Sequence, residues 1–194
     1  MLSQVIKPGS QNCQTVHFEN VLERKSMEVN RIYLDMDGVL ADFDRGVREL
    51  CGMEPLNQMT ATEEDNNRLW AAIAKIDHFY YRLTLIPHAE ILVRTLMGKY
   101  GERCEILTGI PKPRRNIKDA AEDKIRWIER YFGPRLKVNT VYRQEKKNYC
   151  HAKGDILIDD LMSTVRDWDS YGGTGILFTD VKSVMDKLRS MGVL

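Results

Sequence analysis

The stretch Arg31-Ile-Tyr-Leu-Asp35-Met-Asp37-Gly-Val-Leu-Ala41 points to the fold of this 194-residue chain. It predicts a short buried strand that ends in two carboxylates, one residue apart, followed by a glycine turn. A buried strand should not end in paired acids unless a cation or a reacting group offsets their repulsion and desolvation. An Asx-type turn after the strand is the alternative, because Asp and Gly are common turn residues.

The spacing of the two acids gives each of them a chemical role. Asp35, at the end of the strand, would face a phosphorus atom beyond the carboxyl edge of the sheet and act as the nucleophile. Asp37 would return to the same side as general acid and base, while Gly38 lets the backbone turn. Carboxylates form aspartyl-phosphate intermediates, and Mg²⁺ would keep both acids ionised and neutralise the phosphoryl group.

A second acidic pair ends another apolar segment, Asp155-Ile-Leu-Ile-Asp159-Asp160. If both segments are strands of one parallel sheet, the two acidic pairs converge at the same edge. Only a divalent metal makes four clustered carboxylates tolerable. We therefore assign the metal site to Asp35, Asp37, Asp159 and Asp160, with Asp159 as a ligand and Asp160 in the outer shell.

A third strand, Cys104-Glu-Ile-Leu-Thr108-Gly109, lies between these two in the sequence and ends in a hydroxyl followed by glycine. Thr108 can donate a hydrogen bond to a phosphate oxygen, and the backbone N–H groups that follow it can do the same. We assign phosphate binding to Thr108 and Gly109.

Together these residues resemble the ordered signatures of the haloacid dehalogenase superfamily of phosphotransferases: Asp-x-Asp, Ser/Thr, Lys and an acidic pair. Over about residues 30–180 the chain is more closely similar to the 5'(3')-deoxyribonucleotidases. The chain departs from that family's usual Ser or Thr followed by Pro, because it carries Gly109-Ile110. The motifs that carry the resemblance are Asp35-Met-Asp37-Gly-Val-Leu-Ala-Asp-Phe43, Leu-Thr108-Gly, Lys124-Ile-Arg-Trp127-Ile-Glu-Arg-Tyr-Phe132-Gly133 and Leu-Ile-Asp159-Asp160.

This resemblance implies a Mg²⁺-dependent phosphomonoesterase whose small phosphorylated substrate is a nucleoside monophosphate. Two alternatives stay open. A phosphatase of the same fold could act on a sugar phosphate, another metabolite or a nucleic-acid end, and polar residues facing the site from the cap would favour it. A noncatalytic protein could bind phosphorylated ligands, but Asp35 and Asp37 argue against it, since a nucleophilic carboxylate would repel a bound phosphate.

A lysine should bridge the nucleophile and the phosphate and screen their repulsion. Lys147 is favoured narrowly, because the nucleotidases place a phosphate-contacting lysine in the segment before the Asp159 strand. Lys124 is the second candidate, since its place at the edge of an apolar helix face would let it snorkel inward. Each of them could instead be an ordinary solvated lysine.

From Ile32 onward, short strands alternate with helical tracts, which favours an α/β fold. We expect a Rossmann-like haloacid dehalogenase fold: a mostly parallel five-stranded sheet with helices on both faces, formed by a catalytic core of residues 28–51 and 88–194. The predicted strands span residues 32–34, 104–107, 137–141, 155–158 and 175–178, and the predicted helices 42–50, 89–100, 116–132, 162–168 and 181–191.

Residues 52–87 break the alternation and predict a small helical cap inserted after the first strand, with a helical stripe over residues 63–81. A comparable insertion in the nucleotidases covers the substrate base. We therefore assign base stacking to the aromatic residues Phe43, Trp70, Phe79 and Tyr80, and further substrate contacts to Lys112 and Arg143. The alternative is that the aromatic residues only hold the cap together.

Composition limits the remaining function classes. The chain is 43% hydrophobic, which suffices for one core, and it carries a formal net charge of +1, so we expect no binding of duplex nucleic acid. No apolar stretch approaches the ~20 residues that span a bilayer. The four Cys and four His residues lack metal-ligand spacing and are interpreted as reduced thiols and ordinary histidines.

Residues 1–27 are expected to form an N-terminal extension, with a short helix over residues 16–24. A mitochondrial presequence is disfavoured, because Glu19 and Glu23 interrupt a segment that should be poor in acids. The cytoplasm is the expected location, and a homodimer is left open as the assembly.

Overall fold

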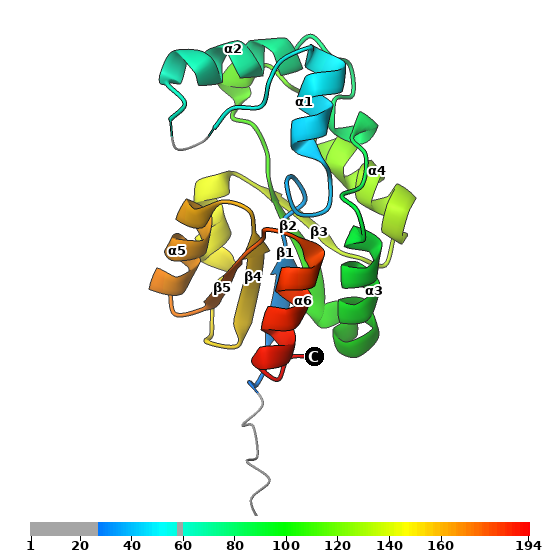
Figure 1. The fold of residues 1–194 in the computed structure, drawn as a ribbon, viewed down its shortest axis with the longest axis vertical. Coiled ribbons are helices and arrows are strands. Elements are labelled where there is room, and N and C mark those ends of the chain that lie inside the picture. The colour runs from blue at the N-terminus through cyan, green and yellow to red at the C-terminus, as the bar shows by residue number, and fades with distance from the viewer. Residues whose placement is uncertain (1–26, 58–59) are drawn as a thin grey trace, which may run out of the picture.

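A central parallel sheet organises the chain in the computed structural model, which describes residues 27–57 and 60–194 (Figure 1). Its strand order is β3-β2-β1-β4-β5, and all four pairings are parallel. The α/β fold with a five-stranded parallel sheet is thus confirmed. The strands are β1 (Arg31–Leu34), β2 (Cys104–Gly109), β3 (Val138–Val141), β4 (Asp155–Asp159) and β5 (Thr174–Leu177).

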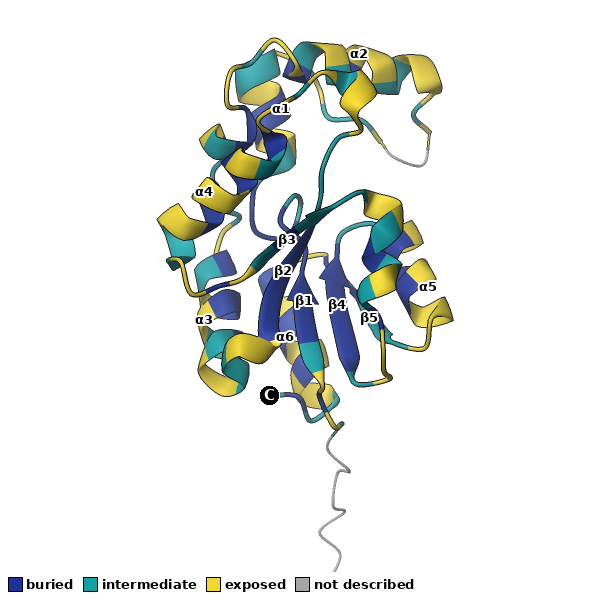
Figure 2. Cartoon of the chain, turned by 180° about the vertical axis from the view of Figure 1, so that it is seen from behind, coloured by how far each residue is buried: buried dark blue, intermediate teal, exposed yellow. Residues whose placement is uncertain are grey.

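Helices cover both faces of this sheet, because a parallel sheet must bury both of its faces. Figure 2 shows the central strands β1, β2 and β4 mostly buried, the edge strands β3 and β5 partly buried, and the exposed residues on the outward faces of the helices. The α-helices are α1 (Phe43–Cys51), α2 (Glu63–Ile73), α3 (Ala89–Tyr100), α4 (Ala120–Phe132), α5 (Met162–Ser170) and α6 (Val181–Ser190). Short 3-10 helices are η1 (Tyr80–Arg82), η2 (Gly101–Arg103), η3 (Pro113–Arg115) and η4 (Arg143–Tyr149).

Alternation along β1 divides the core between the two faces. Ile32 and Leu34 are fully buried in the larger cluster, which includes residues of α3, α4 and α6. Tyr33 points to the smaller cluster, where its ring lies 5.5 Å, centroid to centroid, from the ring of Trp168 in α5. The Trp168 indole N–H also donates to the Asp155 carbonyl at 3.0 Å, which ties α5 to the start of β4.

The insertion after β1, here residues 42–84, carries α1 and α2 beyond the carboxyl ends of the strands and so includes α1, which lies before the cap predicted over residues 52–87 (Figure 1). Its two ends are hydrogen-bonded to each other: Asp42 N–H donates to the Thr84 carbonyl and Ile86 N–H to the Leu40 carbonyl, both at 2.8 Å. The helix expected over residues 63–81 is wrong in its length. It ends at Ile73, and the chain then turns through His78, which has a left-handed φ of 53° that does not continue a right-handed helix.

The helix expected over residues 116–132 likewise begins later, at Ala120. Asn116 adopts a left-handed φ of 54° at the end of η3, which separates that turn from α4. The short helix predicted over residues 16–24 lies outside the described residues. Among the helices of residues 27–57 and 60–194, none is long and apolar enough to cross a membrane.

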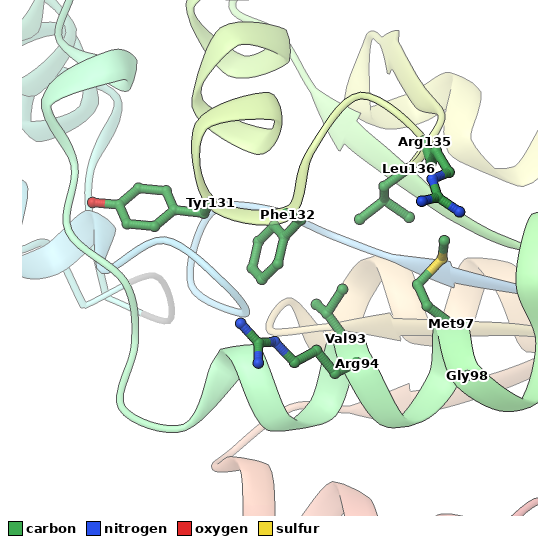
Figure 3. Close-up of a pocket in the computed structure, with 8 residues that line it drawn as sticks. All are labelled: Val93, Arg94, Met97, Gly98, Tyr131, Phe132, Arg135 and Leu136. Carbon is green, nitrogen blue, oxygen red and sulfur yellow. The ribbon is translucent and has the colours of Figure 1, made fainter.

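A cavity of about 380 Å³ lies between α3 and the end of α4 (Figure 3). Its wall combines apolar side chains such as Val93 and Phe132 with the guanidinium groups of Arg94 and Arg135. None of the acids at the carboxyl edge of the sheet lines it. The cavity therefore lies apart from the acids at the carboxyl edge of the sheet.

Candidate active site

The register of β1 and β4 brings two acids to the same sheet edge. Leu34 pairs with Ile158, and Asp35 N–H donates to the Ile158 carbonyl at 2.9 Å, so pairing continues one residue beyond β1. Asp35 is 5% exposed, and its Oδ1 accepts from Met36 N–H at 2.7 Å. Asp159, the last residue of β4, is fully buried. This is the convergence that the sequence predicts for parallel strands.

Asp160 completes a cluster in which one carboxylate oxygen from each of Asp35, Asp159 and Asp160 lies within 4.8 Å of the other two. Burial, together with the charges of Asp35 and Asp159, raises the pKa of Asp160 to about 8. Gly38, at φ 73°, makes room for this acid, because a Cβ there would lie 2.3 Å from Asp160 Oδ2. Three crowded carboxylates that offer only oxygen donors fit Mg²⁺.

Lys146 supplies a cation to this cluster. Its Nζ lies 2.9 Å from Asp35 Oδ2 and 2.7 Å from Asp159 Oδ2, and the side chain is 2% exposed. Burial opposes its charge, but the two carboxylates outweigh that effect and raise its pKa. Lys147, the lysine favoured from the sequence, does not reach the acids. Its Nζ lies 5.0 Å from the centroid of the Tyr171 ring, and the lysine beside Asp35 is Lys146 instead.

A second buried lysine forms an ion pair with Asp37, the other acid of the Asp-x-Asp run. Lys124 projects from α4, is fully buried, and donates to Asp37 Oδ2 at 2.6 Å and to Thr108 Oγ1 at 2.9 Å. Asp37 is consequently paired with an ammonium group and is not one of the three clustered carboxylates, which differs from its assignment as a metal ligand. Burial raises the pKa of Asp37, although Lys124 opposes that shift.

The aromatic residues of the insertion are mostly core. Phe79 and Tyr80 are each 1% exposed, and their ring centroids lie 5.3 Å apart in an edge-to-face contact. Phe43 packs in the same way on Phe79 at 5.6 Å. Because rings buried on all sides offer no open face to a base, the structure does not support stacking by Phe79 or Tyr80. The alternative, that these aromatics hold the insertion together, describes their contacts better.

The remaining predicted substrate residues lie on the loops around the site. Trp70 of α2 is partly buried, and the guanidinium carbon of Arg115 lies 5.8 Å from its ring centroid. Lys112 and Arg143 are exposed. A Cβ on Gly109 would lie 3.7 Å from that of Arg143, so Arg143 flanks the predicted phosphate loop.

Sequence reasoning missed two features of the site. Lys146 was passed over for its neighbour, although both lie in the same basic run before β4. The ion pair between His78 and Asp123, at 2.8 Å, joins the insertion to α4 one residue before Lys124, and no motif in the sequence indicates it.

Comparison with known proteins identifies relatives of this chain. The family model of the 5' nucleotidase, deoxy (pyrimidine), cytosolic type C proteins matches residues 28–189. The human cytosolic-type 5'(3')-deoxyribonucleotidase is 30% identical over 152 residues, which cover 70% of this chain and 72% of that protein. The human mitochondrial 5'(3')-deoxyribonucleotidase is 28% identical over 147 residues, which cover 67% of this chain and 61% of that relative's length.

A solved structure supports the fold as well. The haloacid dehalogenase-like family hydrolase from Streptococcus pneumoniae superimposes with a TM-score of 0.51 over 81% of this chain and 90% of its own, at 11% sequence identity. The expected haloacid dehalogenase fold is thereby confirmed. With the parallel sheet, the clustered acids and the match over residues 28–189 together, the chain belongs to the family of 5' nucleotidase, deoxy (pyrimidine), cytosolic type C proteins.

Proposed function

We propose that this protein is a Mg²⁺-dependent phosphomonoesterase that hydrolyses nucleoside monophosphates, in the manner of a 5'(3')-deoxyribonucleotidase. One observation carries the proposal: the two acids of the Asp-x-Asp run lie at the sheet edge, and each is paired with its own buried lysine. A site that only held phosphate would gain nothing from a carboxylate aimed at the anion. A site that transfers a phosphoryl group needs a nucleophile, a proton donor and cations around them.

In the first half of the reaction, Asp35 attacks phosphorus in line with the ester oxygen that departs, forming an aspartyl-phosphate. Lys146 holds the Asp35 carboxylate in place through Oδ2, and Met36 N–H holds it through Oδ1. Thr108, oriented by its hydrogen bond from Lys124, is placed to donate its hydroxyl proton to a phosphoryl oxygen.

Asp37 moves the proton in both halves of the reaction. Its Oδ1 is buried without a hydrogen-bond partner among the described residues, while Lys124 occupies Oδ2. Because burial raises its pKa, Asp37 can hold a proton for the departing alkoxide. It then takes a proton from the water that hydrolyses the aspartyl-phosphate, which regenerates Asp35.

Asp35, Asp159 and Asp160 would hold the Mg²⁺ ion, with Lys146 offsetting part of their charge. When bound, the ion neutralises the negative charge of the phosphoryl group during its transfer. Without a divalent cation, the three carboxylates face a single ammonium group, and this excess of negative charge contributes to the raised pKa of Asp160. The donor set therefore suits the metal that the proposal requires.

The names of the human relatives support a nucleotide as the substrate, since both are 5'(3')-deoxyribonucleotidases. The burial of Phe79 and Tyr80 removes two of the expected stacking residues, so the structure itself does not choose between a base and a sugar. We retain residues 52–87 as the proposed cap and the cytoplasm as the proposed location.

The test is phosphate release from a panel of deoxyribo- and ribonucleoside 5'- and 3'-monophosphates and common sugar phosphates, with Mg²⁺ and with chelator. We expect Mg²⁺-dependent release from nucleotides that disappears in Asp35→Asn. Release only from sugar phosphates would keep the mechanism and refute the substrate. No turnover of any substrate by folded protein with bound Mg²⁺ would refute the enzymatic proposal in favour of a binding protein.

A further inference from the structure

The segment that returns from the insertion, residues 78–83, packs along α4 through a series of polar and aromatic contacts. At its start, His78 Nδ1 lies 2.8 Å from Asp123 Oδ1. At its end, the Trp127 indole N–H donates to the Leu83 carbonyl at 2.7 Å. Asp123 and Trp127 lie on the side of α4 from which Lys124 reaches the site, since residues three to four apart lie on one side of a helix.

Tyr80 lies between these two attachments and touches the lysine itself. The Lys124 Nζ is 4.6 Å from the centroid of the Tyr80 ring. Both side chains are buried, at 0% and 1% exposure. A cation over an aromatic ring is held more strongly when water is excluded, so this contact adds to the hydrogen bonds that Lys124 makes with Asp37 and Thr108.

The His78–Asp123 pair joins the segment that carries Tyr80 to α4. Asp123 is 2% exposed, and a buried carboxylate is costly unless it has a partner. His78 provides that partner from a left-handed backbone conformation, φ 53°, which is uncommon outside glycine. Its hydrogen bond with Asp123 raises the pKa of His78, with Asp119 adding to the shift and Arg126 opposing it.

We infer that Tyr80 is a positioning residue that aims the Lys124 ammonium group at Asp37 and Thr108, and that the His78–Asp123 ion pair holds Tyr80 in place on α4. The return segment of the insertion thus contributes to catalysis through a lysine and not through the substrate base. The kinetic part of this inference rests on the proposed function. The contact between Tyr80 and Lys124 can be measured without it.

The contact is tested by NMR of protein with ¹³C-labelled lysine, with the Lys124 signals assigned by their loss in Lys124→Arg. We expect ring-current-shifted Lys124 Hε signals in the wild type and in Tyr80→Phe, which keeps an aromatic ring. Tyr80→Leu should return them toward the random-coil position. Shifted signals that persist in Tyr80→Leu overturn the inference, whether or not the protein turns over any substrate.

The role of the ion pair is tested with His78→Ala and His78→Asn. Asn tolerates a left-handed conformation and keeps a side-chain donor. His78→Asn should therefore preserve the ring-current shift of the Lys124 signals, whereas His78→Ala should reduce it. His88→Ala is the matched control. His88 is also left-handed, at φ 68°, but it is exposed, and its side chain makes no capping hydrogen bond to α3. An equal loss of the ring-current shift in His88→Ala and His78→Ala would overturn a specific role for the ion pair.

Kinetics with the best nucleotide of the panel completes the test. Tyr80→Leu should lower kcat by about tenfold with little change in KM, the size expected for a desolvated cation–aromatic contact. His78→Ala should lower kcat less, and His78→Asn should restore it. A rise in KM with unchanged kcat in Tyr80→Leu would mean that Tyr80 contacts the substrate and would overturn the inference. Absence of wild-type turnover would refute the proposed function, while the NMR result would still decide the contact.

Discussion

Replacing Lys146 with methionine should destabilise the metal-free protein while leaving its shape unchanged. Methionine has a similar length and no charge, so Lys146→Met removes only the ammonium group that lies 2.9 Å from Asp35 and 2.7 Å from Asp159. Both carboxylates stay buried, at 8% and 0% side-chain exposure, and in the variant they repel each other with no ammonium group from η4 between them.

The magnitude follows from these distances. At an effective dielectric constant of about 20, each charge pair at such a distance attracts by roughly 6 kcal/mol. Desolvation of the buried ammonium group offsets much of this attraction in the wild type. Removing one partner of a buried ion pair typically costs about 3–5 kcal/mol, because the remaining charge is left uncompensated. We expect a loss of that size in the free energy of unfolding for Lys146→Met at pH 7 in chelator.

The assay is urea unfolding followed by circular dichroism, in EDTA and in excess Mg²⁺. Lys147→Met is the matched control. It removes the same charge one residue away, where the ammonium group lies against the Tyr171 ring, and should cost less than about 1 kcal/mol. Equal losses in the two variants, or a loss in Lys146→Met below about 1 kcal/mol, would refute the electrostatic account of the site.

Two further predictions concern Asp160. Gly38→Ala should destabilise the protein by roughly 1–2 kcal/mol, because an L-residue is strained at φ 73°. It should also weaken Mg²⁺ binding in calorimetry by about tenfold or more, since the new Cβ would displace Asp160; unchanged affinity would contradict the contact. A raised pKa of about 8 means that folded Asp160 keeps a proton that the unfolded chain releases near pH 4, so in EDTA stability should fall as the pH rises from 4 to 8. Urea unfolding across this range should show a smaller fall in Asp160→Asn than in the wild type; identical profiles would rule out the assigned titration.

The sheet could be predicted from the sequence because its strands are short apolar runs with clear ends. The expected strand over residues 155–158 differs from β4 by one residue. The position of the acids follows from the same pattern, since the carboxyl ends of parallel strands share one edge. Asp35, Asp159 and Asp160 could therefore be brought together without coordinates.

The choice of lysine could not be made in this way. Lys146 and Lys147 lie in η4, a 3-10 turn of seven residues, where no long hydrophobic period shows which side chain points inward. Their difference arises from tertiary packing, which turns one residue to the acids and its neighbour to Tyr171. Lys124 was easier to interpret, because α4 is long enough for its apolar face to be recognised.

The aromatic residues show a second limit of prediction from the sequence. Spacing along the chain indicated an apolar stripe over residues 63–81, but a stripe that binds a base and one that fills a core have the same period. Only the packing of Phe79 and Tyr80 on their neighbours distinguishes the two. The ion pair of His78 with Asp123 spans 45 residues and joins groups that have no shared motif.

The hydrogen bonds that join Asp42 to Thr84 and Leu40 to Ile86 make the insertion a side branch with a narrow base. The chain leaves the sheet edge and returns to it at neighbouring points, so what lies between can lengthen or shorten without moving β1 relative to the next strands. Doubling such a loop costs only about 0.6 kcal/mol in closure entropy. A change in chain length around α1 and α2 can accordingly be accommodated in the branch, while the acids at its root keep their positions.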